Sequence, residues 1–291
     1  MKDAKETWCI QIDITNRCEK NCANCTHLVS HAPKWNMDLE TFKKAVDSLV
    51  DWPKVIGIIG GNTTLHPQIK EFTEYFASKI PKKEQRGIWT SNFFGKEAFI
   101  RENYGVIYYN PHSETVVHQP ILCASKDLVK DEATRDKFIS ACWLADQWSP
   151  SITPKGCYRC EVMGAFDMIL GYNLGLPIEK GWWNKPISAF QKQISTFCPL
   201  CSICIPLKPR RDRDHKDDIT ASNLELFKNS PRIKSGQYVL FDEKKFKISD
   251  VNFEKWRPER YRRPTIIESL YKSFKRKLRK YVLNPEETQF L

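Results

Sequence analysis

The chain has 291 residues, of which 41% are hydrophobic, and it carries a formal net charge of +11. This length and composition predict a globular protein with a sizeable core. No stretch approaches the roughly 18 uncharged apolar residues of a membrane span, and the charged start MKDAKE lacks a signal peptide's apolar segment, so we expect a cytoplasmic protein.

Short apolar strands and amphipathic helices alternate over residues 8–150. Strand patterns cover 8–15, 54–61, 86–92 and 104–110, and helical patterns cover 39–50, 67–80, 96–103 and 131–148. Strict alternation predicts parallel strands joined by helical crossovers. In such folds the functional side chains gather at the carboxyl ends of the strands. Three loops, 18–25, 60–64 and 90–92, follow predicted strands, so we expect them to converge.

The first of these loops carries three cysteines with the spacing Cys-x3-Cys-x2-Cys, at Cys18, Cys22 and Cys25. Eleven cysteines in a chain without an export signal favour metal binding over a disulfide framework. Three thiolates can hold three corners of a [4Fe–4S] cluster and leave one iron open to a cofactor. A structural zinc site stays an alternative, with His27 or His31 as its fourth ligand.

A second group of cysteines follows in the stretches GCYRC and CPLCSIC. Four of its five members are expected to bind one metal centre: Cys157, Cys160, Cys198, Cys201 and Cys204. The same sulfur set suits a second [4Fe–4S] cluster or tetrahedral zinc. Cys198 is the weakest of the five candidates, and Cys142 is a candidate from outside the group. Cys9, Cys123 and Cys142 each stand alone in the sequence, and the first interpretation of each is a small buried hydrophobe.

The cysteine loop after the first strand and GIIGGNTTLHP after the second resemble the radical S-adenosylmethionine (SAM) superfamily. The resemblance implies a partial (β/α)6-type barrel over residues 8–150, with a [4Fe–4S] cluster on Cys18, Cys22 and Cys25. In that family the open iron binds the amino and carboxylate groups of SAM. An electron from the cluster cleaves a carbon–sulfur bond, and the resulting 5′-deoxyadenosyl radical abstracts hydrogen from the substrate.

The same resemblance implies a set of SAM-binding residues. They are Gly60, Gly61 and Asn62 along the methionyl amino group, and Thr90, Ser91 and Asn92 near the methionyl or ribose groups. Two positions depart from the family pattern. Asn62 stands where Glu is common, which weakens the contact to the ammonium by about 1 kcal/mol. Asn24 stands where the family often has an apolar residue near adenine.

Beyond residue 150 the strand–helix alternation stops. Residues 151–206 resemble a divergent, shorter form of the auxiliary-cluster regions called twitch and SPASM domains. Residues 207–291 form a predicted basic extension, with 207–218 expected as a loop or linker and 266–283 as a basic amphipathic helix. This basic character predicts a polyanionic substrate, such as a nucleotide, a phosphorylated molecule or a nucleic acid.

The leading hypothesis is a radical SAM oxidoreductase or transferase that receives electrons from a flavodoxin- or ferredoxin-type protein. A peptide-modifying maturase is one alternative, and a non-catalytic, zinc-stabilised nucleic-acid-binding module is another. No catalytic residue is assigned from sequence. Glu161 and Asp167 are candidates for acid–base or substrate contacts, and His66, His112 and His118 follow predicted strands.

Overall fold

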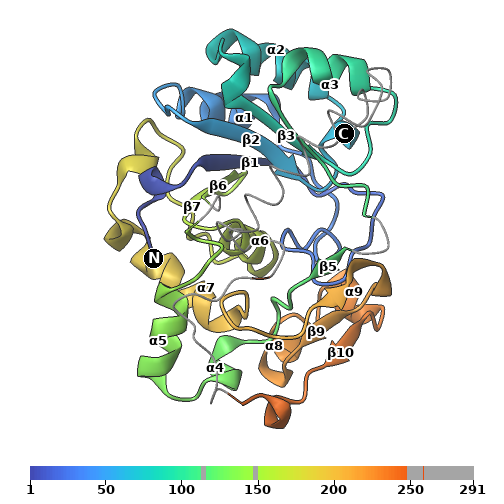
Figure 1. The fold of residues 1–291 in the computed structure, drawn as a ribbon, viewed down its shortest axis with the longest axis vertical. Helices are drawn as coiled ribbons and strands as arrows, with labels where there is room; N and C mark the ends of the chain where they lie inside the picture. Colours follow the sequence, from blue (N-terminus) through green and yellow to red (C-terminus); the bar gives the residue numbers. More distant parts are fainter. Residues whose placement is uncertain (113–115, 147–149, 248–257, 259–291) are drawn as a thin grey trace, which may run out of the picture. The chain divides into compact units, whose positions relative to one another are not determined.

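A mixed α/β fold surrounds a central six-stranded sheet in the order β4-β3-β2-β1-β6-β7 (Figure 1). The computed structural model describes residues 1–112, 116–146, 150–247 and 258. The sheet strands are β1 (Cys9–Thr15), β2 (Val55–Gly60), β3 (Arg86–Thr90), β4 (Val106–Tyr109), β6 (Ser151–Thr153) and β7 (Gly156–Tyr158). The first five are parallel, and β7 runs antiparallel to β6. The predicted α/β partial-barrel class is confirmed.

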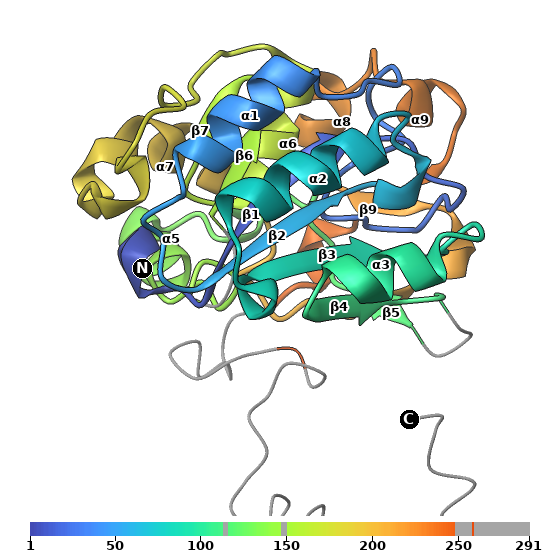
Figure 2. The ribbon, with the colours of Figure 1, turned by 90° about the horizontal axis from the view of Figure 1, so that it is seen from above.

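Three helices cover one face of this sheet, α1 (Leu39–Asp47), α2 (Ile69–Lys79) and α3 (Glu97–Asn103) (Figure 2). Asp38 caps α1, since its carboxylate accepts a hydrogen bond from the backbone N–H of Thr41. The helices α1 and α2 meet through the rings of Phe42 and Phe72, whose centroids lie 4.0 Å apart. The predicted apolar stripe of α1 ends early, because Val50 follows the helix and is 39% exposed.

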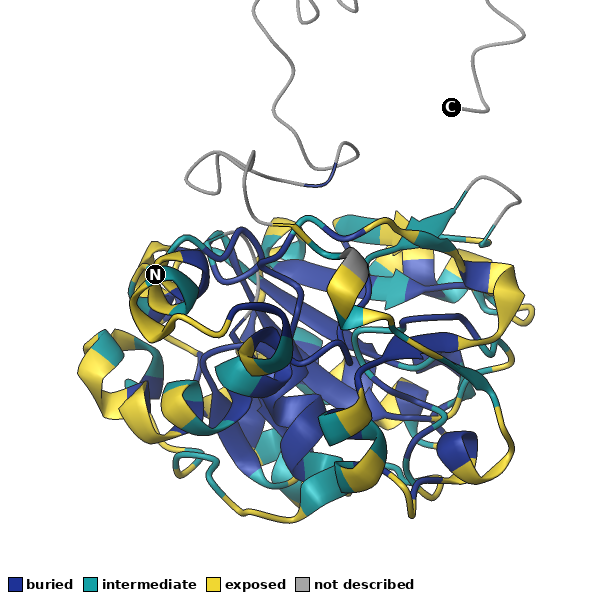
Figure 3. Ribbon diagram, turned by 90° about the horizontal axis from the view of Figure 1, so that it is seen from below, coloured by how far each residue is buried: buried dark blue, intermediate teal, exposed yellow. Residues whose placement is uncertain are grey.

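Every residue of β1 is buried, so both faces of the central strand are covered (Figure 3). Ile10, Ile12 and Ile14 belong to the hydrophobic core under the outer helices. Successive side chains point to opposite faces of a strand, so Gln11 and Asp13 point to the inner face. That inner face is covered by α6 (Glu161–Leu170), which packs against β6 and β7. A polar lining therefore faces the interior between the sheet and α6.

The segment that follows residue 207 contains regular structure where a loop or linker was predicted. β8 (Arg210–Arg211) pairs antiparallel with β5 (Val117–His118), and β9 (Asp217–Ile219) pairs parallel with β10 (Tyr238–Leu240). Two short helices, α8 (Ala221–Leu226) and α9 (Pro231–Lys234), lie between β9 and β10. The loop prediction for 207–218 was wrong because these short strands depend on partners distant in the chain, which charge composition does not reveal.

The remaining helices are short. They are α4 (Ser125–Leu128), α5 (Glu132–Ser140) and α7 (Gln191–Phe197). The predicted helix 131–148 ends at Ser140, since Ala141 leaves the helical conformation. Single 3₁₀ turns lie at Ala4–Glu6, Thr63–Leu65, Lys83–Gln85, Trp182–Asn184, Ile187–Phe190, Cys198–Leu200, Asp212–Asp214 and Glu243–Lys245.

The compact unit Met1–Trp256 contains the predicted segments 8–150 and 151–206 and the beginning of 207–291. The predicted amphipathic helix 266–283 lies outside the described residues. Among the helices that the structure describes, none has the length and apolar character needed to cross a membrane.

Candidate metal and cofactor site

The turn after β2 holds the start of the first cysteine loop through its backbone. The N–H of Gly61 donates to the carbonyl of Thr15 (2.7 Å), and the N–H of Asn62 donates to that of Arg17 (2.7 Å). A Cβ atom on Gly60 or Gly61 would lie 2.2 Å from the same two carbonyl oxygens. Glycine is therefore required at both positions for this close approach. The glycines position the loop, whichever ligand the loop binds.

The cysteines of the first loop lie close enough to influence one another's pKa values. Burial, with a smaller contribution from the nearby Cys25, raises the pKa of Cys18 to about 11. Burial also raises the pKa of Cys22, with both Cys25 and Cys18 contributing in the same direction. Thiolates that would repel one another here are stabilised when a metal centre supplies positive charge. The donor set thus fits a thiolate-bound metal cluster.

Asn24, between the second and third cysteines, holds the loop to β9. Its backbone has a positive φ of 52°, a conformation that Asn adopts more readily than most residues. Its side chain donates to the carboxylate of Asp218 (2.9 Å) and accepts from the Asp218 N–H (3.0 Å). These bonds occupy the buried amide, so Asn24 connects the cysteine loop to β9.

A buried ion-pair network completes this attachment. Asp217 contacts His31, with Oδ2 to Nε2 at 2.7 Å, and forms an ion pair with Nε of Arg232 at 2.6 Å. Arg232 also donates to the backbone carbonyl of Cys22 at 3.1 Å. His31 is thereby engaged by Asp217 and by Ser230, whose Oγ lies 3.1 Å from Nδ1. The segment around β9 and α9 therefore fixes the cysteine loop from outside the barrel strands.

The predicted SAM-binding residues at the ends of β2 and β3 form one hydrogen-bonded group. Oδ1 of Asn62 accepts from the hydroxyls of Thr90 (2.6 Å) and Thr64 (2.8 Å). Nδ2 of Asn62 donates to the Asn92 carbonyl (3.1 Å) and to the carboxylate of Glu19 (2.9 Å). The side chain of Asn62 is buried, and its polar atoms are fully used.

Glu19 is a residue of this group that the sequence analysis missed. Its second carboxylate oxygen accepts from the hydroxyl of Ser91 at 2.7 Å. The only sequence signal for it is an acidic residue directly after the first cysteine of the loop. A single acidic side chain on a loop carries no periodic pattern, so only the converging strand ends distinguish it.

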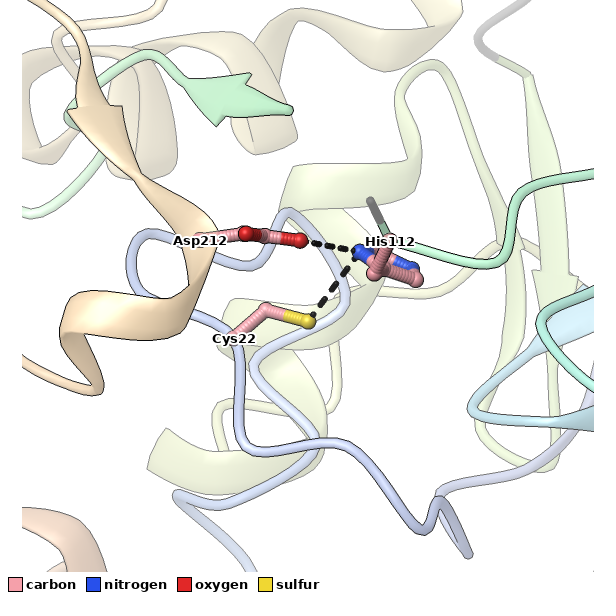
Figure 4. Close-up of side chains that lie close together, drawn as sticks. All are labelled: Cys22, His112 and Asp212. Carbon is pink, nitrogen blue, oxygen red and sulfur yellow. Dashed lines mark hydrogen bonds and ion pairs between the residues drawn. The ribbon is translucent and has the colours of Figure 1, made fainter. Parts of the chain in front are cut away.

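A second arrangement of ligand atoms involves Cys22 (Figure 4). Cys22, His112 and Asp212 each offer one atom, and these atoms lie within 4.8 Å of one another. Nδ1 of His112 lies 2.6 Å from Asp212 and 3.4 Å from Sγ of Cys22. A thiolate, an imidazole and a carboxylate are ligands that zinc accepts. This set shares Cys22 with the predicted cluster site, so the two sites exclude each other.

The second cysteine group meets in an apolar pocket. The pocket is lined by Cys142, Cys160, Cys198, Cys201 and Cys204, with Ile139, Val162, Met163, Phe166 and Phe197 among its apolar residues. Burial raises the pKa values of Cys198, Cys201 and Cys204 well above the ordinary thiol value, and the neighbouring cysteines add to this. Five cysteines thus line one apolar pocket, and this donor set fits a thiolate-bound metal centre.

Cys157 is not brought to this pocket. It lies on β7 within the core that contains Trp182 and Phe190, and its thiol points to the carbonyl of Pro177. Cys160, by contrast, is the N-cap residue of α6. A strand residue and a helix-cap residue three positions apart need not face the same way, and here they do not. The structure brings Cys142 to the group in place of Cys157.

A buried charged cluster lies on the inner face of β1. Burial lowers the pKa of His27, but Asp13 at 2.7 Å outweighs this and raises it to about 10. Burial raises the pKa of Glu161, which His27 partly counteracts. Within the described residues, Oδ2 of Asp13 and Oε2 of Glu161 have no hydrogen-bond partner. These acceptors can take a polar or cationic group inside the barrel.

The other polar candidates have structural contacts. Asp167 accepts hydrogen bonds from the hydroxyl of Tyr158 (2.8 Å) and from two backbone N–H groups of the loop after α6. Nε2 of His66 lies 3.0 Å from the carbonyl of Met37. Nδ1 of His118 lies 2.8 Å from the carbonyl of Ala23 in the cysteine loop. These contacts stabilise the loops around the site.

Comparison with known proteins adds limited information. No protein-family model matches the chain, and no curated protein matches it significantly. Among solved structures, BtrN in complex with AdoMet and 2-DOIA is 14% identical, with a TM-score of 0.43 over 67% of this chain and 88% of that chain. Selenomethionine BtrN in an open conformation is 13% identical, with a TM-score of 0.38 over 69% and 92%. At these values the likeness establishes no activity.

Proposed function

We propose that this chain is a radical SAM enzyme. The observation that carries the proposal is the loop of Cys18, Cys22 and Cys25 at the carboxyl end of β1, held against the glycine turn after β2. Three thiolates leave one iron of a [4Fe–4S] cluster open, and with SAM bound there such a cluster supplies a 5′-deoxyadenosyl radical. The three cysteines of this chain would hold the cluster.

The arrangement of the loops supports this role for the strand ends. Gly60 and Gly61 allow the turn after β2 to lie close to the backbone of Thr15 and Arg17. The hydroxyl of Ser91, after β3, donates to the carboxylate of Glu19 in the cysteine loop. The inner face of the barrel, with Asp13 and Glu161, offers unpaired acceptors for a substrate with polar or cationic groups. The reaction class follows from the cluster, whereas the substrate atom that reacts depends on this inner lining.

A second [4Fe–4S] cluster belongs to the same proposal. Four of the five sulfur atoms from Cys142, Cys160, Cys198, Cys201 and Cys204 would hold it. Because the pocket is apolar and all four corners can be protein-bound, this centre would pass electrons or stabilise the fold. Zinc in the same pocket is the alternative occupant.

The proposed setting is a cytoplasmic enzyme reduced by a flavodoxin- or ferredoxin-type partner. The excess of lysine and arginine after Pro206, 22 against 13 acidic residues, supports a nucleotide-, phosphate- or nucleic-acid-containing substrate. A peptide substrate is the alternative within the same reaction class. Binding of a polyanion should weaken steeply as salt rises, and binding of a neutral peptide should not.

Anaerobic reconstitution with iron and sulfide tests the proposal. The expected product is a brown protein with broad absorption around about 400 nm that forms 5′-deoxyadenosine from SAM and dithionite. Cys18→Ala should abolish 5′-deoxyadenosine formation, whereas Cys9→Ala, a buried cysteine outside both groups, should retain it. Full activity in the Cys18→Ala protein would contradict the proposal.

A zinc-stabilised nucleic-acid-binding module is the second candidate, favoured by the Cys22, His112 and Asp212 set. Metal analysis of protein purified without oxygen separates the two. Zinc without iron, together with nucleic-acid binding that His112→Ala weakens, would favour the module. Iron and sulfide in near-equal amounts would favour the enzyme.

A further inference from the structure

The carboxylate of Glu19 bridges the cysteine loop and the ends of two strands. One oxygen accepts from Nδ2 of Asn62 at 2.9 Å, and the other accepts from the hydroxyl of Ser91 at 2.7 Å. Glu19 directly follows Cys18, whose sulfur lies 3.9 Å from the same carboxylate. The acid is therefore beside the first of the proposed cluster ligands.

Both donors to Glu19 are neutral. Glu19 forms no ion pair with lysine, arginine or histidine among the residues that the structure describes, although the chain is strongly basic. The residue as a whole is exposed, so its carboxylate remains reachable from solvent. Two neutral hydrogen bonds orient the carboxylate without neutralising it. A cationic ligand group can therefore add a charge-assisted hydrogen bond.

Asn62 is unable to provide that contact. Its Oδ1 accepts from two threonine hydroxyls, its Nδ2 donates to Glu19 and to the Asn92 carbonyl, and the side chain is buried. To bind an ammonium group directly, Asn62 would have to break contacts that hold the ends of β2 and β3 together. Its observed contact instead fixes the carboxylate of Glu19.

We propose that Glu19 binds the α-ammonium group of SAM, with Asn62 and Ser91 as residues that position it. This inference rests on the proposed function. The acidic group absent at position 62 is supplied from the cysteine loop, one residue after Cys18. The carboxylate pairs with the ammonium, and the two neutral donors keep it on the side of the β2 and β3 ends.

Equilibrium dialysis of the reconstituted protein tests this, with radiolabelled SAM and with its analogue lacking the amino group. Glu19→Gln should weaken SAM binding by about tenfold, since a charged hydrogen bond becomes neutral. The analogue should bind wild type and variant equally. Iron content should be unchanged. The matched control Glu97→Gln, an exposed acid of α3 paired with Arg101, should leave both affinities as in wild type.

SAM binding by Glu19→Gln at the wild-type affinity would overturn the inference, as would equal weakening of SAM and the analogue or loss of iron. Wild-type protein that holds iron but binds no SAM would defeat the proposed function itself.

Discussion

The first cysteine loop lies among hydrogen-bonding and charged side chains, whereas the second cysteine group lies among apolar ones. Cys18 and Cys25 are partly exposed, and the loop between them is fixed by Asp217 and Arg232. Cys201 and Cys204 are each 7% exposed in an apolar pocket. Cys22 of the first loop is also 7% exposed and Cys198 of the second group is partly exposed, so the two groups differ in the polarity of their surroundings more than in burial. The difference teaches that, if both groups hold metal as proposed, the first surroundings suit a centre that takes up a ligand and the second a centre bound by protein alone.

The largest expected effect concerns the second cysteine group, in which the structure places Cys142 and not Cys157. Cys142→Ala should lower reconstituted iron by up to about half, because one of two four-iron centres loses a candidate ligand. Cys157→Ala should retain all the iron and cost only about 1 kcal/mol of stability for a small cavity. Iron and sulfide analysis measures both variants. Iron loss in Cys157→Ala alone would reverse the assignment.

The next effect concerns the contacts by which Asp217 and Arg232 hold the first cysteine loop. Arg232→Ala leaves the buried Asp217 with His31 but without its arginine partner, so the free energy of unfolding should fall by about 3 kcal/mol. Arg101→Ala on α3 removes an exposed pair and should cost about 0.5 kcal/mol. Urea unfolding of the metal-free proteins measures both. Equal losses would indicate that the β9–α9 attachment does not stabilise the loop.

A smaller effect is expected at Asn24. Asn24→Ala removes two hydrogen bonds to Asp218 and places at positive φ a residue that adopts this conformation less readily than Asn, which should cost about 2–3 kcal/mol. Asn24→Gly keeps the backbone freedom and should cost about 1 kcal/mol less. Chemical unfolding curves compare the two variants. If both cost the same, the conformation of Asn24 is unimportant and only its side-chain contacts matter.

The smallest effect is a difference in thiol reactivity in the metal-free protein. Cys18 should be alkylated about tenfold faster than Cys201, because burial shields Cys201 and raises its pKa well above the ordinary value. The rate at Cys18 should still rise between pH 8 and pH 10 without a plateau, since its pKa is raised to about 11. Peptide mapping after timed alkylation measures both rates. Faster labelling of Cys201 would contradict the comparison of the two cysteine groups.

Local sequence was sufficient for much of the sheet and for the position of the first cysteine loop at the end of β1. The alternation of strands and helices predicted β1 to β4 and α1 to α3, because periodicity and caps such as Asp38 act within one element. The close approach of Gly60 and Gly61 to the backbone carbonyls of Thr15 and Arg17 was not predicted, because it depends on how two separate loops meet. The spacing of Cys18, Cys22 and Cys25 keeps them on one loop, whatever the rest of the chain does.

Only the tertiary structure decided which distant residues meet at each site. Cys142 reaches the second cysteine group and Cys157 does not, because the latter points into the core from β7. Asn62 is occupied by threonine hydroxyls, and Glu19 reaches the strand ends, through contacts between separate loops. Side-chain direction and long-range hydrogen bonding depend on how elements pack, and neither leaves a periodic trace in the sequence.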